Sequence, residues 1–173
     1  MGVRPITLIT RCAAVLALAG LAPPLAAAER ADGTTDLPIP RFVSLKSNSA
    51  MMRTGPDDTR FPIAWEYKRR GLPMEVVREY GIWRLVRDPE GTTGWMNKSL
   101  LTGERTGYIT GETRTLYTSP DLQSRVAWRI APGAVVTITL CESLWCRVSN
   151  GGRSGYILRN QMWGTYPNEA IGG

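Results

Sequence analysis

The chain has 173 residues, a formal net charge of +6, three cysteines and no histidine. Without an imidazole, neither a Ser-His nor a Cys-His mechanism can be assembled from this chain alone. Three cysteines without a histidine are too few for an ordinary zinc site, and only two remain if the N-terminal segment described next is removed on export. The composition therefore favours a binding protein over an enzyme, with no catalytic residues, no metal and no cofactor.

Residues 1–28 have the pattern of a secretory signal peptide. Arg4 and Arg11 accompany the apolar stretch CAAVLALAGLA, which is shorter than the roughly 18 residues of a membrane-spanning helix. Ala26 and Ala28 form an A-x-A cleavage signature. We expect cleavage after Ala28, a periplasmic or secreted location and no stable membrane insertion. The alternative is a retained N-terminal anchor.

The exported chain keeps a positive charge. Removing 28 of the 173 residues leaves 145, and the net charge falls to +4 because two arginines leave and no acidic residue does. Positive charge in a cell envelope favours anionic partners such as wall polymers, whereas nucleic acid is not an expected partner there. The alternative is that scattered lysines and arginines only keep the protein soluble. Cys12 leaves with the signal peptide, without the residues that precede a lipoprotein cysteine.

Most of the exported chain consists of two copies of one unit of about 60 residues. The matching pairs are Ala64-Trp65 with Ala127-Trp128, Trp83 with Trp145, Val86 with Val148, and Gly94-Trp95 with Gly155-Tyr156. The offset between copies drifts from 64 to 61, and each gap falls in a loop, where insertions are tolerated best. We predict a linker at 29–40, a first domain at 41–104, a second domain at 105–166 and a tail at 167–173.

Each copy reads as a series of short strands separated by turn residues. In the first copy the strand-like segments are VSLKS, AMMRT, IAWEYK, PMEVVREY, IWRLVRD and TTGWMN, which are rich in β-branched and aromatic residues. In the second copy, residues 136–140 alternate Val, Thr, Ile, Thr, Leu, a period of two with one buried face. No convincing amphipathic helix is present. The pattern predicts an all-β protein in which each copy forms a small, partly open five-stranded barrel.

Cys141 and Cys146 invite four interpretations. A zinc site needs more ligands, a redox couple usually has the spacing C-x-x-C, and a cysteine nucleophile needs a nearby base. A structural disulfide is the interpretation that remains. An oxidising compartment, as predicted from the signal peptide, is where such bonds persist.

The internal repeat supports a disulfide across a hairpin. It places Glu79 and Arg84 where Cys141 and Cys146 stand. Opposite charges attract on facing positions of paired strands, and such positions are close enough for a disulfide. This pairing sets Val148 opposite Thr139, out of the apolar register, and a β-bulge in the hairpin would restore the pattern.

Five segments of the first copy, in this order and spacing, resemble the bacterial SH3-like (SH3b) domain family: RTGP, FPIAWEY, GLPMEVV, GIWRLV and GTTGWMNKSLL. The second copy is similar in YTSP, RVAWRI, GAVVTI, LWCRV and SGYI. The resemblance implies two tandem SH3-like β-barrels that bind peptides, wall components or other proteins, usually without catalysis. The second copy departs from the pattern at Ser119, opposite Gly55 of the first, and at Tyr156, opposite Trp95.

We expect the ligand surface in the first copy, around the loop after its first strands. Aromatic residues there would form a floor bordered by charges of both signs, which suits an extended peptide or a sugar-peptide strand. The candidate residues are Arg53, Asp57, Asp58, Arg60, Phe61, Trp65 and Tyr67. The alternative is that Trp65 and Trp128 pack at the seam between the copies. We expect Trp83, Trp95, Trp145 and Tyr156 to be core residues because they recur in both copies.

These patterns predict a non-catalytic exported protein whose tandem domains bind peptidoglycan or a protein or peptide partner in the envelope. The first alternative is a structural or regulatory subunit of an envelope complex without a separate ligand site. The second is a small wall hydrolase, whose two carboxylates would come from Asp57 with Asp58 or Glu66.

Overall fold

The computed structural model describes residue 2 and residues 32–172. Apart from residue 2, the predicted signal peptide and its cleavage site lie outside the described residues. Within the described part, no helix has the length and hydrophobicity to cross a bilayer.

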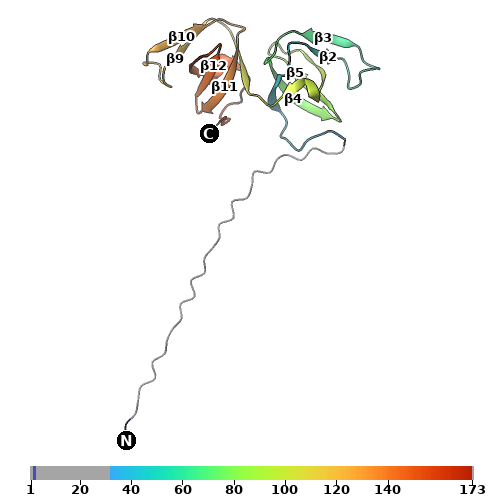
Figure 1. Cartoon of the computed structure of the whole chain (residues 1–173), viewed down its shortest axis with the longest axis horizontal. Helices are drawn as coiled ribbons and strands as arrows, with labels where there is room; N and C mark the ends of the chain where they lie inside the picture. Colours follow the sequence, from blue (N-terminus) through green and yellow to red (C-terminus); the bar gives the residue numbers. More distant parts are fainter. Residues whose placement is uncertain (1, 3–31, 173) are drawn as a thin grey trace.

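The chain forms two seven-stranded antiparallel sheets, one from each copy (Figure 1). The first sheet contains β1 (Arg41–Leu45), β2 (Ala50–Arg53), β3 (Ile63–Tyr67), β4 (Pro73–Tyr80), β5 (Trp83–Arg87), β6 (Thr93–Asn97) and β7 (Leu101–Thr102). The second contains β8 (Thr106–Ile109), β9 (Arg114–Tyr117), β10 (Val126–Ile130), β11 (Val135–Glu142), β12 (Trp145–Asn150), β13 (Arg153–Leu158) and β14 (Met162–Trp163). Short 3₁₀ helices, η1 (Lys98–Leu100) and η2 (Arg159–Gln161), precede the last strand of each copy.

The strand order is the same in both sheets. It is β3-β2-β6-β5-β4-β1-β7 in copy 1 and β10-β9-β13-β12-β11-β8-β14 in copy 2, so each strand of copy 2 takes the place of its counterpart. The first and last strands of each order are not hydrogen-bonded to each other, so the sheets are open rather than closed barrels. The predicted all-β class with two tandem units is confirmed, but each unit is an open seven-stranded sheet and not the five-stranded barrel that the sequence predicted.

Each sheet surrounds its own apolar core. Alternate residues of a strand point to opposite faces, so one face of each long central strand supplies buried side chains. Met74 and Val76 of β4 are fully buried in copy 1, and Val136 and Ile138 of β11 are buried in copy 2. Each copy of the repeat therefore buries its own core, and the two copies form two sheets and not one large sheet.

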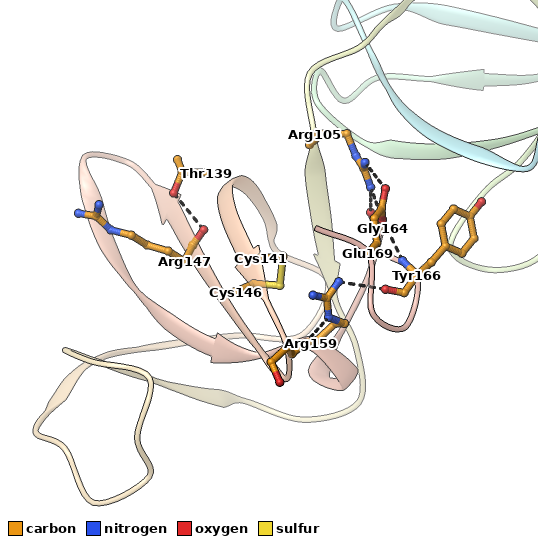
Figure 2. Close-up of a disulfide and its surroundings, with 10 residues drawn as sticks. Arg105, Thr139, Cys141, Cys146, Arg147, Arg159, Gly164, Tyr166 and Glu169 are labelled. Carbon is orange, nitrogen blue, oxygen red and sulfur yellow. Dashed lines mark hydrogen bonds and ion pairs between the residues drawn. A yellow bond between two sulfur atoms is a disulfide. The ribbon is translucent and has the colours of Figure 1, made fainter. Parts of the chain in front are cut away.

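The hairpins β4–β5 and β11–β12 have the same register. Glu79 faces Arg84 in copy 1, and Cys141 faces Cys146 in copy 2, where the two Cα atoms are 4.1 Å apart and the side chains form a disulfide (Figure 2). The predicted disulfide is therefore confirmed. A register shift between Ile138 and Leu140 places Ile138 opposite Val148, which is the bulge that the apolar pattern required.

In copy 1 the facing pair belongs to a buried ionic cluster. The carboxylate of Glu79 accepts hydrogen bonds from the backbone N–H of Thr35 at 2.6 Å, from its hydroxyl at 2.8 Å, and from Arg41. Arg84 lies 3.1 Å from Glu79 and donates to the carbonyl oxygen of Gly33 at 2.9 Å. Burial by itself raises the pKa of Glu79, but the donors outweigh it and hold that pKa below its usual value.

In copy 2 the C-terminal segment covers the equivalent hairpin. The N–H of Cys141 donates to the carbonyl of Ile171 at 2.7 Å, and the N–H of Ile171 donates back at 3.2 Å. The side chain of Ile171 joins the core of copy 2. Both hairpins are thus covered by chain that lies outside the repeated unit.

The two copies meet through aromatic and polar contacts. The ring of Phe42 in β1 packs against Trp163 at 4.8 Å and against Tyr166 at 4.7 Å between centroids. The Tyr166 hydroxyl donates to Glu75 of β4 at 2.8 Å, and Tyr108 of β8 packs against the core of copy 1. Neither Trp65 nor Trp128 takes part in these described contacts.

Candidate functional site

The loop between β2 and β3 is held by its own side chains. Asp57 accepts hydrogen bonds from the hydroxyl of Thr59 at 2.8 Å and from the backbone N–H groups of Thr59 and Arg60, both at 2.9 Å. These bonds, that of the Thr59 hydroxyl above all, lower the pKa of Asp57. Arg53 donates to the carbonyl oxygen of Phe61 at 2.8 Å. The charges of this loop therefore fix its shape.

Phe61 lies against the backbone at Gly55. A Cβ atom added at Gly55 would collide with the phenyl ring, so a residue without a side chain is needed there. Copy 2 has Ser124 at the position of the ring, and its hydroxyl donates to the carbonyl of Ser119 at 3.2 Å. The absence of a ring explains why copy 2 tolerates a side chain where copy 1 has glycine.

Trp65 is the most exposed tryptophan of the described strands, with 56% of its surface accessible. It faces Met52 across the β2–β3 pair, where a register shift between Met52 and Arg53 leaves Ala64 as the extra residue. Its ring centroid lies 6.4 Å from that of Tyr67. No described residue accepts a hydrogen bond from its indole N–H.

Beside this ring lies a hollow of about 210 Å³, which we call the Trp65 hollow. It is lined by Trp65, Glu66, Tyr67, Lys68, Arg69, Leu72, Asp88, Pro89, Glu90 and Tyr108. Leu72 and the ring of Tyr67 are buried, so they form an apolar floor, whereas the rim carries charges of both signs. Tyr108 comes from copy 2, so the second copy completes the wall.

Tyr67 connects the hollow to the core of copy 1. Its hydroxyl donates to Asp88 Oδ2 at 2.8 Å, and only 7% of the residue is exposed. Burial, followed by the bond to Asp88, raises the pKa of Tyr67 far above its usual value. Asp88 also accepts from the N–H groups of Glu90 and Thr92, so it anchors the turn that forms the far rim.

The structure brings together only part of the predicted ligand residues. Trp65 and Tyr67 line the hollow, but Arg53, Asp57 and Phe61 shape the neighbouring loop, and Asp58 and Arg60 are exposed on it. The turn at residues 88–90 and Tyr108 also line the hollow and were not predicted from the sequence. The turn residues DPEG were a visible signal, but nothing local in the sequence places them beside Trp65.

The equivalent tryptophan of copy 2 is packed. Trp128 Nε1 donates to the carbonyl of Ser154 at 3.1 Å, and the ring packs against the core of copy 2. Ile130 stands where copy 1 has Tyr67. The exposed, unbonded indole is therefore a property of copy 1.

Four recurring aromatic residues lie elsewhere than predicted. Trp83, Trp95, Trp145 and Tyr156 are half-buried and belong to neither core, so the expectation that they are core residues is wrong. In β5 the inward positions are taken by Arg84 and Val86, and alternation turns Trp83, the residue before Arg84, to the outer face. Tyr117 and Trp145 pack edge to face on that outer side, with centroids 5.8 Å apart.

Within residues 32–172, no three Cys, Asp or Glu side chains are grouped so as to hold a metal ion. The site offers rings, one free N–H donor and rim charges. Such groups can bind a ligand by contact and hydrogen bonding.

Comparison with known families shows to which family the chain belongs. The sequence pattern described as the bacterial SH3 domain matches residues 46–103 and 111–164, which together make up more than half of the chain. The chain belongs to the bacterial SH3 domain family. The two matched regions correspond to the two sheets, so copies 1 and 2 are two bacterial SH3 domains in tandem.

No curated protein matches the chain. Among solved structures, it is similar to an NlpC/P60 family protein from Bacillus cereus ATCC 10987, at 16% identity and a TM-score of 0.31, covering 70% of this chain and 55% of that one. It is also similar to NlpC2 and NlpC1 from Trichomonas vaginalis, each at 14% identity, with TM-scores of 0.34 and 0.32. Those matches cover 73% and 75% of this chain, and 49% and 47% of the other two. The chain thus spans about half the length of these structures.

Proposed function

We propose that this tandem bacterial SH3 protein is a non-catalytic binding protein of the cell envelope, and that the Trp65 hollow takes an extended peptide. The peptide would belong to peptidoglycan or to an envelope protein. The observation that carries the proposal is the exposed indole of Trp65 beside an apolar floor with a charged rim. The location in the envelope rests on the sequence pattern of residues 1–28.

An extended peptide suits the chemistry of the hollow. The Trp65 ring offers contact area at a small entropic cost, and its N–H can donate to a peptide carbonyl. Glu90 and Arg69 on the rim give opposite charges that would orient a chain. At about 210 Å³ the hollow is smaller than the roughly 300–1,000 Å³ of sites that enclose a small molecule, which favours a segment that lies across it.

The hydrolase alternative has less support. Asp57, which was to supply one of two catalytic carboxylates, is engaged by Thr59 and Arg60 in the loop. The NlpC/P60 structures are about twice as long as the part that this chain matches, so their activity gives no argument for this chain.

The proposal is tested with Trp65→Ala and with Trp128→Ala as the matched variant in copy 2. Binding is measured by co-sedimentation with purified wall sacculi and by titration with stem-type peptides, beside thermal unfolding. We expect Trp65→Ala to weaken binding about tenfold or more with little change in melting, as for an exposed contact residue. Trp128→Ala should lower the free energy of unfolding by about 2–3 kcal/mol, because it removes packing and a hydrogen bond. The variant should therefore melt at a lower temperature than the parent.

Three results would contradict the proposal. Unchanged binding by Trp65→Ala would remove the hollow as the site. A parent protein that binds neither sacculi nor peptides, but is recovered with an envelope complex, would favour the structural-subunit alternative. Loss of turbidity of sacculi on incubation with the parent would favour the hydrolase.

A further inference from the structure

Copy 2 contains a second cavity, on the side of the domain that carries the disulfide. It has a volume of about 380 Å³ and lies between the β11–β12 turn, η2 and residues 165–168. Its apolar lining residues include Leu144, Leu158, Met162 and Pro167. This cavity is remote from the Trp65 hollow in sequence and shares no lining residue with it.

A buried arginine lines this apolar cavity. Arg159 is only 8% exposed. Its Nε donates to the carbonyl of Ser143 at 3.0 Å and its Nη1 to the carbonyl of Tyr166 at 2.9 Å, so it links the hairpin turn to the C-terminal segment (Figure 2). Both acceptors are neutral. Its Nη2 is buried and has no hydrogen-bond partner, and neither has the hydroxyl of Thr165, another lining residue.

Glu169 is the nearby carboxylate. Burial raises its pKa and the charge of Arg159 contributes to lowering it, but the hydrogen bonds of the carboxylate are made with other groups. Glu169 accepts two hydrogen bonds from Arg105, at 2.6 and 3.0 Å (Figure 2). No described carboxylate forms an ion pair with Arg159. A buried guanidinium is costly unless it is paired, and unsatisfied buried polar groups in a native protein are rare. Two such groups at one apolar cavity point to an anionic ligand.

Copy 1 lacks this arrangement. The residue equivalent to Leu144 is Ile82, and Gly33 packs against one side of it so closely that an added Cβ would lie 2.9 Å from Ile82 Cγ2. The buried arginine of copy 1, Arg84, is paired with Glu79. The N-terminal segment thus packs against the hairpin turn in copy 1, whereas the turn of copy 2 borders a cavity.

We propose that this cavity binds a small monocarboxylate with an apolar body. The carboxylate would pair with the Arg159 guanidinium and accept from the Thr165 hydroxyl, and the body would lie against Leu144, Leu158 and Met162. The volume is near the lower end for small-ligand sites, roughly 300–1,000 Å³, so a body of a few carbon atoms fits best. The inference concerns a different copy from the proposed function and stands independently of it.

This chemistry has two sources, the C-terminus of an apolar peptide and a free aliphatic acid. The probes are N-acetyl-leucine for the first, hexanoate for the second, and N-acetyl-leucinamide as the control that lacks the carboxylate. Each is titrated into the ¹⁵N-labelled protein, and the amide signals of Leu144, Asn160 and Asn168 are followed. We expect N-acetyl-leucine or hexanoate, or both, to shift these signals, and the tighter of the two acids identifies the source.

The control compound tests the role of the charge. N-acetyl-leucinamide should bind at least about tenfold more weakly than N-acetyl-leucine, since a charge-assisted hydrogen bond is lost. If hexanoate alone binds, hexanamide takes the place of the control. Equal binding of acid and amide, or no shift with either acid at millimolar concentration, would overturn the proposal.

A pair of variants tests the place of binding. Leu144 is 68% exposed, so Leu144→Ala should fold normally while weakening the binding of the acid about tenfold. Ile82→Ala, the same change at the equivalent position of copy 1, should leave the affinity unchanged. Unaltered affinity in Leu144→Ala, or shifts that map to copy 1, would also overturn the proposal.

Discussion

The β4–β5 hairpin of copy 1 and the β11–β12 hairpin of copy 2 share register, bulge and turn conformation, but their strands are joined by different chemistry. At the same facing positions, copy 1 has Glu79 and Arg84 and copy 2 has Cys141 and Cys146. The disulfide needs no further partner. The ion pair is buried, and it is satisfied only with the help of Arg41, Thr35 and Gly33.

This difference shows what a buried charge requires. A facing pair of positions accepts either a covalent bond or two opposite charges, but desolvated charges must have nearly all their hydrogen bonds made. Copy 1 meets this requirement with Arg41 of β1 and with Gly33 and Thr35, which lie outside the repeat. We therefore expect copy 1 to depend more strongly than copy 2 on single polar side chains.

The largest expected effect comes from Glu79→Ala. This change leaves the buried Arg84 and the half-buried Arg41 without a carboxylate, and it should lower the stability of copy 1 by about 3–5 kcal/mol. Denaturant unfolding followed by residue-resolved hydrogen exchange, at Val76 for copy 1 and Val148 for copy 2, measures it. Glu66→Ala is the control, because its ion pair with Lys68 is exposed and should contribute less than about 1 kcal/mol. Equal effects of the two substitutions would refute the comparison.

Acid should weaken copy 1 through the same carboxylate. Burial raises the pKa of Glu79, but its donors outweigh burial and lower it. A depressed folded-state pKa gives stability that is present above the unfolded value of about 4.3 and is lost as the pH falls through the folded value. Exchange protection at Val76 should therefore fall in acid, and Glu79→Gln should flatten this dependence. An equally steep fall in the variant would assign the effect to other carboxylates.

Removing the disulfide should have a smaller effect on copy 2. The bond closes a short loop, with a sequence separation of 5 residues, so the chain-entropy estimate is about 2 kcal/mol. The double substitution Cys141→Ala and Cys146→Ala should lower protection at Val148 by this amount and leave Val76 nearly unchanged. If the loss of stability were as large as that caused by Glu79→Ala, copy 2 would depend on its facing pair as strongly as copy 1 does, and the comparison would fail.

The smallest effect is expected at the turns. Gly81 and Ser143 occupy equivalent positions with φ values of 53° and 50°, in the left-handed region that favours glycine. Ser143→Gly should therefore stabilise copy 2, by about 1 kcal/mol. Thermal unfolding checks the sign, and a destabilised variant would show that the serine side chain has a role of its own.

The fold and the hairpin register could be predicted from the sequence because they repeat. The equivalence of Glu79–Arg84 with Cys141–Cys146 located the facing positions, and the misplaced Val148 indicated the bulge. Trp83 was assigned to the wrong face because its size and recurrence suggested burial. The inner face at that point is occupied by Arg84, and only the donors and acceptors contributed by residues 33–41 make this acceptable.

The candidate site was predictable only in part, for a similar reason. Trp65 and Tyr67 are two residues apart on one strand, so their proximity follows from strand geometry. The rest of the hollow comes from the turn at 88–90 and from Tyr108 of the other copy. Those contacts depend on tertiary packing and on the docking of the two copies, which no local pattern encodes.

Each hairpin is covered by a segment near one end of the chain, and this limits where the protein can be cut into fragments. The matched family regions begin at residue 46 and end at residue 164, so they contain neither Thr35 nor Ile171. A fragment cut at those limits would uncover the Glu79 carboxylate and leave the backbone of Cys141 unpaired. The autonomous folding unit is thus larger than the unit of duplication, and a third copy joined end to end would need a covering segment of its own.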